Sequence, residues 1–172
     1  MKTILTEAQI SAGIDQLAIR LAAEYRGRPL TVLGVLTGSL IFLSDLIRRL
    51  DIPLRVGLIQ ASSYRGRATV PGALTISEGA MPEVAGRDVL LLDDIFDTGR
   101  TLAGLLDSLS RRGPVSLRSA VLLWKEGRQQ VAISPDYHCF RIPDVFVVGY
   151  GLDYNDEYRH LPYVAALSET EL

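Results

Sequence analysis

Apolar residues recur along the chain with two periods, which predict helices alternating with strands. The helical period predicts three helices, at residues 6–25, 39–50 and 101–112. Thr6 and Gln9 have the spacing of a capping box at the start of the first helix, and Ser39 is expected to cap the second. Short continuous apolar runs predict the strands, at residues 30–36, 54–60, 74–77, 89–92, 117–124 and 145–148. Because such strands are apolar on both faces, the alternation favours an α/β fold with a mainly parallel central sheet flanked by helices.

Residues 61–73 differ from their surroundings, because they are rich in small residues and have no helical period. A segment of this length predicts a loop that serves as a lid or a mobile hairpin. The rest of the 172 residues contains no internal repeat, low-complexity tract or long linker, and the length suits a single domain over residues 1–172.

The composition is typical of a soluble globular protein, since 48% of the residues are hydrophobic and 22% are charged. The net charge of −2 lacks the basic excess of a dedicated nucleic-acid binder. Cys139 is the only cysteine, so no internal disulfide is expected, and the first twenty residues lack the apolar core of a signal peptide. No segment approaches the roughly 18 apolar residues of a membrane span. We therefore expect a cytoplasmic protein without a membrane partner.

Lysine is rare in this chain: of eighteen basic residues, only Lys2 and Lys125 are lysines. Lys2 lies at the chain start, whereas Lys125 ends a predicted strand. The planar fork of arginine suits two oxygens of one phosphate or carboxylate, whereas an ammonium group suits a single carbonyl oxygen. Lys125 is therefore a candidate binding residue, and the alternative is a solvated lysine at a strand end.

Three carboxylates follow the most apolar strand, in the segment Leu90-Leu-Leu-Asp-Asp-Ile-Phe-Asp-Thr-Gly-Arg-Thr101. Ligands of open α/β sheets bind just beyond the carboxyl ends of the strands, and the N–H groups that open the next helix suit a phosphate. The alternative is that Asp97 or Thr98 caps the helix and the other acids are solvated. A Walker-type Gly-Lys-Ser/Thr is missing from the sequence, and the acids do not have Asp-x-Asp spacing.

Residues 91–101 resemble the signature with which type I phosphoribosyltransferases bind phosphoribosyl pyrophosphate (PRPP). Further residues and segments of the chain resemble those of the hypoxanthine-guanine branch of this family. They are Leu36-Thr-Gly-Ser39, Ser62-Ser-Tyr64, Lys125, Phe146-Val-Val-Gly-Tyr-Gly-Leu-Asp153, and Arg159. They span residues 36–159 in the order of the family. The resemblance implies the type I phosphoribosyltransferase fold, with a small hood subdomain formed from chain-terminal segments.

The resemblance also implies roles around PRPP. The 5′-phosphate and ribose would be bound by Asp93, Asp94, Asp97, Thr98, Gly99, Arg100 and Thr101, with Asp97 as the catalytic general base. Mg²⁺ is the implied cofactor, with Asp93, Asp94 and Asp153 in its environment. The implied pyrophosphate-binding residues are Leu36, Thr37, Gly38 and Arg159, with a non-proline cis peptide bond between the first two. Thr37 departs from the family, because many members have Lys or Arg there; a role of the backbone survives this change.

For the purine, the resemblance implies that Lys125 donates to the 6-oxo group and that Phe146 stacks on the ring. The backbone of Val147 and the side chain of Asp153 would read the base edge, and Ser63 and Tyr64 would belong to a mobile lid. A buried core position for Phe146, and surface pairing for Asp153 and Arg159, are the alternatives. We expect Cys139, His138 and His160 to be structural.

These features together predict an enzyme of purine salvage. It would transfer the 5-phosphoribosyl group of PRPP to N9 of hypoxanthine or guanine, giving IMP or GMP and pyrophosphate. Two alternatives are a xanthine-preferring enzyme and an RNA-binding regulator of the pyrimidine-operon attenuation type. The acidic net charge, Lys125 and residues 146–153 weigh against the regulator. The expected partners are PRPP and a purine base, without nucleic acid, and the family suggests a homodimer or homotetramer.

Overall fold

The computed structural model describes residues 1–63, 74–168 and 170–171. Its elements, in chain order, are β1 (Lys2–Leu5), α1 (Glu7–Glu24), β2 (Leu30–Leu36), α2 (Leu40–Ile47), β3 (Leu54–Ser63), β4 (Leu74–Ala80), β5 (Asp88–Phe96), α3 (Arg100–Ser110), β6 (Ser116–Lys125), β7 (Tyr137–Ile142), β8 (Val147–Val148) and β9 (Val164–Ala166). The described helices include none with the length and apolar character that crossing a membrane requires.

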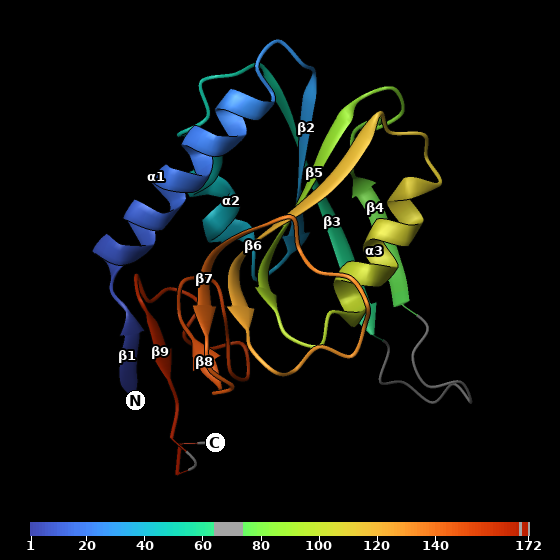
Figure 1. The fold of residues 1–172 in the computed structure, drawn as a ribbon. Coiled ribbons are helices and arrows are strands. Elements are labelled where there is room, and N and C mark those ends of the chain that lie inside the picture. The colour runs from blue at the N-terminus through green and yellow to red at the C-terminus, as the bar shows by residue number, and fades with distance from the viewer. Residues whose placement is uncertain (64–73, 169, 172) are drawn as a thin grey trace, which may run out of the picture.

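The main sheet has the order β4-β3-β2-β5-β6-β7, in which β3, β2, β5, β6 and β7 are parallel and β4 is antiparallel at one edge. Figure 1 shows α1 and α2 on one face of this sheet and α3 on the other. The predicted α/β fold, with a mainly parallel sheet flanked by helices, is therefore confirmed.

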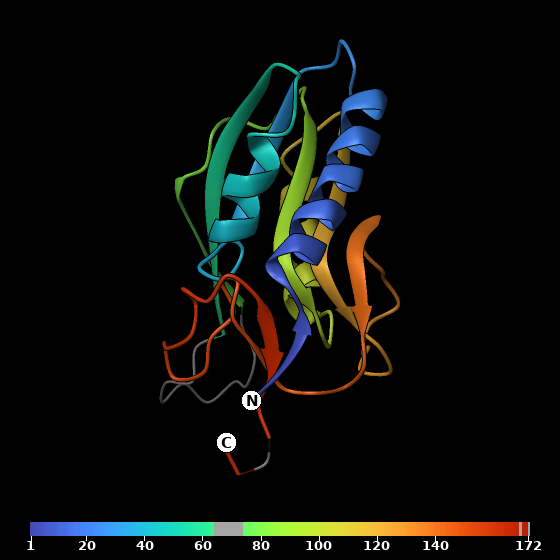
Figure 2. The same cartoon turned by 90° about the vertical axis from the view of Figure 1, so that its left-hand side faces the viewer.

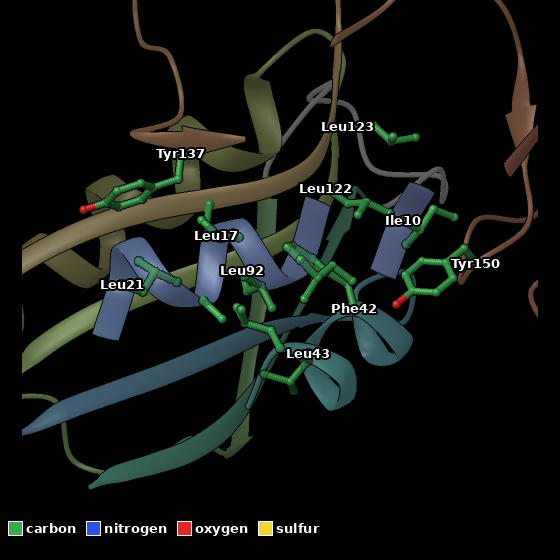
Figure 3. Packing of buried hydrophobic residues seen from close by; sticks show 14 of the residues in the cluster. Ile10, Leu17, Leu21, Phe42, Leu43, Leu92, Leu122, Leu123, Tyr137 and Tyr150 are labelled. Carbon is green, nitrogen blue, oxygen red and sulfur yellow. The ribbon is translucent and has the colours of Figure 1, made fainter. Parts of the chain in front are cut away.

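The continuous apolar run of β5 is explained by the two cores that it serves. Leu90 and Leu92 are fully buried against α1 and α2, and Val89 and Leu91 against α3. Figure 3 shows Leu92 beside the side chains that α1 and α2 contribute. Because successive strand side chains point to opposite faces, a strand covered on both sides needs apolar residues at every position.

A second, three-stranded sheet has the order β1-β9-β8 and joins the two ends of the chain. Lys2 pairs with Ala166 and Val147 pairs with the same residue from the other side, both antiparallel. Figures 1 and 2 place this sheet beside the carboxyl ends of the parallel strands. It forms the small hood that the resemblance implied. The strand predicted at residues 145–148 is shorter than expected, because only β8, Val147–Val148, belongs to this sheet.

Several predictions of local structure need correction. Residues 61–63 extend β3 and are not loop, because they pair with β4. Ser39 does not cap α2, because its hydroxyl donates instead to Val35 O at 2.6 Å, and the helix ends at Ile47 rather than residue 50. Asp93 and Asp94 lie within β5 rather than after it, and β1, β7 and β9 were not predicted. The capping box of α1 is confirmed.

Asp88 lies at the end of the main sheet opposite the hood, where its buried carboxylate accepts hydrogen bonds from two side chains. Arg28 Nε donates to its Oδ2 at 2.9 Å, and the Ser116 hydroxyl also donates to it. Burial pushes the pKa of Asp88 upward, but these hydrogen bonds outweigh burial and hold the pKa below its usual range. The ionised form is thus favoured by folding, and its contribution to stability is lost as the pH falls through the folded-state pKa.

Asp88→Asn is therefore expected to destabilise the fold by about 1–3 kcal/mol at neutral pH, because buried donors lose a charged acceptor. The cost should shrink as the pH falls below about 4, where the Asp88 carboxylate of the unfolded chain takes up its proton, and it should be smallest below the lower folded-state pKa. Urea unfolding of both proteins over this pH range measures the difference. Asp107→Asn removes an exposed carboxylate that pairs with Arg111 and is the matched control. A cost that is independent of pH would contradict this account of Asp88.

Candidate active site

A cavity of about 330 Å³ opens at the carboxyl ends of β2 and β5 and the start of α3. It is lined by eleven of the residues predicted from the sequence: Leu36, Thr37, Gly38, Asp93, Asp94, Asp97, Thr98, Gly99, Thr101, Asp153 and Arg159. These come from two strand ends, a helix start and the hood loop. The structure therefore brings together the residues predicted for PRPP, pyrophosphate and metal.

Asp93 and Asp94 form an acidic pair near the end of β5. Asp93 is buried and its Oδ1 accepts the N–H of Asp94 at 3.0 Å, while Asp94 Oδ1 accepts the N–H of Ile95 at 2.7 Å. Burial, together with the charge of the neighbouring Asp94, raises the pKa of Asp93 well above its usual range. Burial also raises the pKa of Asp94, against the opposing effects of its hydrogen bonds and of Arg159. Two carboxylates that are costly to ionise together suit a site that receives a cation.

The loop after β2 contains the cis peptide bond expected between Leu36 and Thr37. Its next residue, Gly38, allows an unusually close approach of neighbouring groups. A Cβ at this position would overlap Asp94 Oδ2 and lie 2.6 Å from Asp94 Cγ. A glycine is therefore needed for the loop to lie directly against the acidic pair.

The hood loop closes the same wall of the cavity. Gly151 has a φ of +98°, and a Cβ there would overlap the carbonyl oxygen of Gly38. Arg159 Nη1 donates to the carbonyl oxygen of Gly151 at 2.8 Å, and Nη2 pairs with Asp153 Oδ1 at 2.8 Å. The contact between the two glycines thus places the ion pair of Asp153 and Arg159 at the cavity. The two side chains do pair with each other, but they do so in the lining of the cavity rather than on a remote surface.

The helix α3 starts at the cavity. Its N-cap is Gly99, with a φ of +82°, and this residue makes no side-chain cap hydrogen bond. The N–H of Arg100, the first helical residue, donates to Thr98 Oγ1 at 3.5 Å. Neither Asp97 nor Thr98 is therefore the N-cap residue of α3, although the Thr98 hydroxyl accepts one N–H of its first turn. A Cβ on Gly99 would also clash with Phe96, 2.7 Å away at Cε2. A turn of this kind leaves backbone donors at the positive end of the helix dipole, where an anion binds well.

Lys125 lies at the end of β6, beside Asp97 but outside the lining of the cavity. Its side chain is only 9% exposed, and its Nζ is 3.5 Å from Asp97 Oδ2 and 3.8 Å from Asp144 Oδ1. The alternative of a solvated lysine is therefore wrong. Arg128 was not predicted, yet its Nε donates to Asp97 Oδ1 at 3.0 Å. Arg128 and Asp144 carry no motif, so only the three-dimensional arrangement identifies them.

Phe146 is 40% exposed, so the alternative of a core phenylalanine is wrong. Its ring meets the ring of Tyr154 edge to face, at 5.5 Å between centroids. Val147 is buried in β8. An exposed aromatic face held by a second ring can stack on a planar ligand.

Some predicted residues lie elsewhere. Arg100 is exposed at the start of α3 and is not among the lining residues of the cavity. Ser63 is the last residue of β3, and Tyr64 lies outside the described residues. Asp153 does not join Asp93 and Asp94 in a ready-made metal site, since no three His, Cys, Asp or Glu of the described ranges form one.

Comparison with known proteins agrees with this site. The family model described as the phosphoribosyl transferase domain matches residues 1–155. The chain is 37% identical over 168 residues to the hypoxanthine-guanine phosphoribosyltransferase of Streptococcus pneumoniae, covering 98% of this chain and 93% of that protein. It is 39% identical over 166 residues to the enzyme of the same name from Staphylococcus aureus, covering 96% and 93%.

Solved structures show the same relationship. A mutant hypoxanthine phosphoribosyltransferase from Trypanosoma cruzi, in a ternary complex with substrates, superposes with a TM-score of 0.92 at 37% identity. The match covers 99% of this chain and 96% of that one. The chain therefore belongs to the phosphoribosyltransferase family, and it has the type I fold of the members named hypoxanthine-guanine phosphoribosyltransferases.

Proposed function

We propose that this chain transfers the 5-phosphoribosyl group of PRPP to N9 of hypoxanthine or guanine, giving IMP or GMP and pyrophosphate. The observation that carries the proposal is the pairing of Asp97 and Lys125, 3.5 Å apart, next to the start of α3, whose N-cap is Gly99. A carboxylate beside an ammonium group offers an acceptor and a donor side by side. The N7 and O6 edge of a 6-oxopurine requires this combination when N7 carries its proton.

The 5′-phosphate would occupy the start of α3. The N–H groups of Thr98, Gly99, Arg100 and Thr101 would donate to it, together with the threonine hydroxyls. Because Arg100 is exposed and is not among the residues that line the cavity, we assign its contribution to the backbone rather than to the guanidinium group.

Mg²⁺ would be held by the acidic pair, Asp93 and Asp94, directly or through water, and Asp153 would act from the hood. When bound, the ion neutralises the charge that develops on the departing pyrophosphate. The raised pKa values of both acids fit this assignment, since a cation relieves their mutual repulsion. Backbone groups of Leu36, Thr37 and Gly38, with the side chain of Arg159, would bind the pyrophosphate itself.

At the purine end, Lys125 would donate to O6, Phe146 would stack on the ring, and the backbone of Val147 would read the base edge with Asp153. Asp97 would accept the N7 proton as the base attacks the anomeric carbon. Transfer passes through a sugar with oxocarbenium character, which the nearby carboxylates of this site would stabilise. Ser63 and Tyr64 remain the predicted lid, which would exclude water from the reactive sugar.

The same proposal includes a cytoplasmic location and a homodimer or homotetramer, as the resemblance implied. The two alternatives receive less support. The two relatives described above both bear the name hypoxanthine-guanine phosphoribosyltransferase, rather than that of a xanthine enzyme or an RNA-binding regulator.

Initial rates with PRPP and Mg²⁺ against hypoxanthine, guanine, xanthine and adenine test the proposal. We expect turnover of hypoxanthine or guanine and essentially none of adenine, whose amino group meets a donor at Lys125. No turnover of any 6-oxopurine would refute the proposal, and a clear preference for xanthine would favour that alternative.

Lys125→Arg is expected to lower kcat/KM for hypoxanthine by about 10- to 100-fold, because the planar guanidinium cannot replace a point donor in a buried position. The same rate measurements on the variant test this. Arg141→Lys, a basic replacement on the exposed face of β7, is the matched control. An unchanged preference for 6-oxopurines over adenine would show that Lys125 does not read the base.

A further inference from the structure

Four charged side chains alternate in sign around a ring beside the cavity. Arg128 Nε donates to Asp97 Oδ1 at 3.0 Å, and Arg128 Nη1 lies 3.6 Å from Asp144 Oδ2. Lys125 Nζ closes the ring, at 3.5 Å from Asp97 Oδ2 and 3.8 Å from Asp144 Oδ1. Each cation therefore faces both carboxylates, and the proposed function uses only Asp97 and Lys125.

The ring connects three separate segments of the chain. Asp97 follows β5, Lys125 and Arg128 belong to the end of β6 and the loop after it, and Asp144 lies two residues before Phe146. The same loop is also tied to the phosphate end, because Gln130 N–H donates to Thr98 O at 2.9 Å. The side chain of Lys125 is 9% exposed, whereas those of Arg128 and Asp144 are about half exposed.

The geometry of the ring restricts both groups that would read the purine. With Arg128 on Oδ1 of Asp97, the carboxylate is fixed in rotation and its Oδ2 lies on the side of Lys125. Lys125 Nζ lies between the two carboxylates, at 3.5 Å from Asp97 Oδ2 and 3.8 Å from Asp144 Oδ1, so both attract it and neither holds it at a short hydrogen-bond distance. The planar guanidinium can serve two carboxylates through different N–H groups, which an ammonium group in its place could not do with the same geometry.

We propose that Arg128 and Asp144 are positioning residues for the purine end of the site. Arg128 aims the Asp97 carboxylate, and Asp144 holds Lys125 where its Nζ can meet O6. Through Asp144, the ring also ties this pair to the segment that carries Phe146. This inference rests on the proposed function, and it assigns roles to two residues for which the sequence offered none.

If Arg128 and Asp144 position the purine-reading groups, their loss should affect the kinetics of the purine and of PRPP differently. The proposed phosphate end uses backbone N–H groups of residues 98–101, and in the described part of the chain no hydrogen bond or ion pair of the ring side chains reaches these groups. Loss of Arg128 should therefore weaken turnover and use of the purine while leaving use of PRPP unchanged. A purely structural role would instead lower stability and affect both substrates alike.

Steady-state kinetics of Arg128→Ala test the inference. The concentration of each substrate is varied in turn while the other substrate is kept saturating. We expect kcat/KM for hypoxanthine to fall about tenfold or more, because the reacting groups lose their alignment. The KM for PRPP should stay within about twofold of wild type, and the thermal midpoint should match that of the control. The control is Arg111→Ala, which removes an exposed arginine from another ion pair, with Asp107. Equal losses for both substrates, or a variant indistinguishable from Arg111→Ala, would overturn the proposal.

Three further variants test the ring as a unit. Asp144→Asn keeps the shape of the side chain and should also raise the KM for hypoxanthine, and the double variant should lose less than the product of the single losses. Independent effects that multiply would overturn the claim that the two residues act through one ring. Arg128→Lys should recover no more than part of the loss, and full recovery would contradict the bridging role. Failure of the wild-type protein to use any 6-oxopurine would count against the proposed function instead.

Discussion

Replacing Asp97 by asparagine is expected to reduce kcat for hypoxanthine by about 10²–10⁴-fold, the typical cost of losing a general base. The amide has the shape of the carboxylate and its oxygen can still accept the hydrogen bond from Arg128 Nε. It cannot take the proton from N7. The loss should therefore fall on turnover, while the dissociation constant for PRPP changes little, because the 5′-phosphate would be bound by backbone N–H groups.

Pre-steady-state rates, together with equilibrium titration of PRPP in the presence of Mg²⁺, separate these effects. Asp107→Asn, on the exposed side of α3, controls for the loss of one carboxylate. Unchanged turnover in Asp97→Asn would remove this residue from the mechanism. A loss confined to PRPP affinity would give it a binding role only.

Gly151→Ala is expected to reduce kcat/KM for PRPP by about 100-fold, because the two loops at the pyrophosphate end can no longer meet. The new methyl group would overlap the carbonyl oxygen of Gly38 and force apart the loop after β2 and the hood loop. Arg159 would move with them, since its guanidinium donates to Gly151 O and its own carbonyl oxygen accepts the N–H of Gly151. Asp97 and Lys125, which lie at the ends of β5 and β6 rather than in these two loops, should be less affected.

The matched control is Gly113→Ala. Gly113 also has a positive φ, of +72°, but nothing lies within 4 Å of a Cβ placed there. It should cost about 1–2 kcal/mol of stability from backbone strain alone and leave kinetics unchanged. If the two variants had the same activity, the contact between Gly38 and Gly151 would not matter for the site.

The helices and strands that could be predicted are those whose own sequence shows a helical period or a continuous apolar run. Residues 89–92 of β5 are an uninterrupted apolar run and β2 is mainly apolar, because both strands are covered on both faces, and α1 has a capping box and one apolar face. β7 was missed because it lies at the edge of the sheet, where His138 and Arg141 interrupt the apolar run. β1 and β9 were missed because each is short and exists only through pairing across the length of the chain.

The candidate site likewise has one part that could be predicted from the sequence and one part that could not. Residues 93–101 are contiguous, so their acids, glycine and threonines could be recognised as one ligand-binding segment. The contact of Gly38 with Gly151, and the ring that Arg128 and Asp144 complete, join residues far apart in the chain. Such contacts leave no local signal in a single sequence.

The proposed reaction joins a phosphoribosyl group to a 6-oxopurine at this site and releases pyrophosphate. Phosphorus NMR of the purified protein with PRPP, Mg²⁺ and hypoxanthine measures this directly, because it resolves both products. We expect IMP and pyrophosphate to appear in equal amounts as PRPP is consumed, and chelation of the metal to stop both. Persistence of PRPP, or its hydrolysis to ribose 5-phosphate without IMP, would refute the proposed transfer.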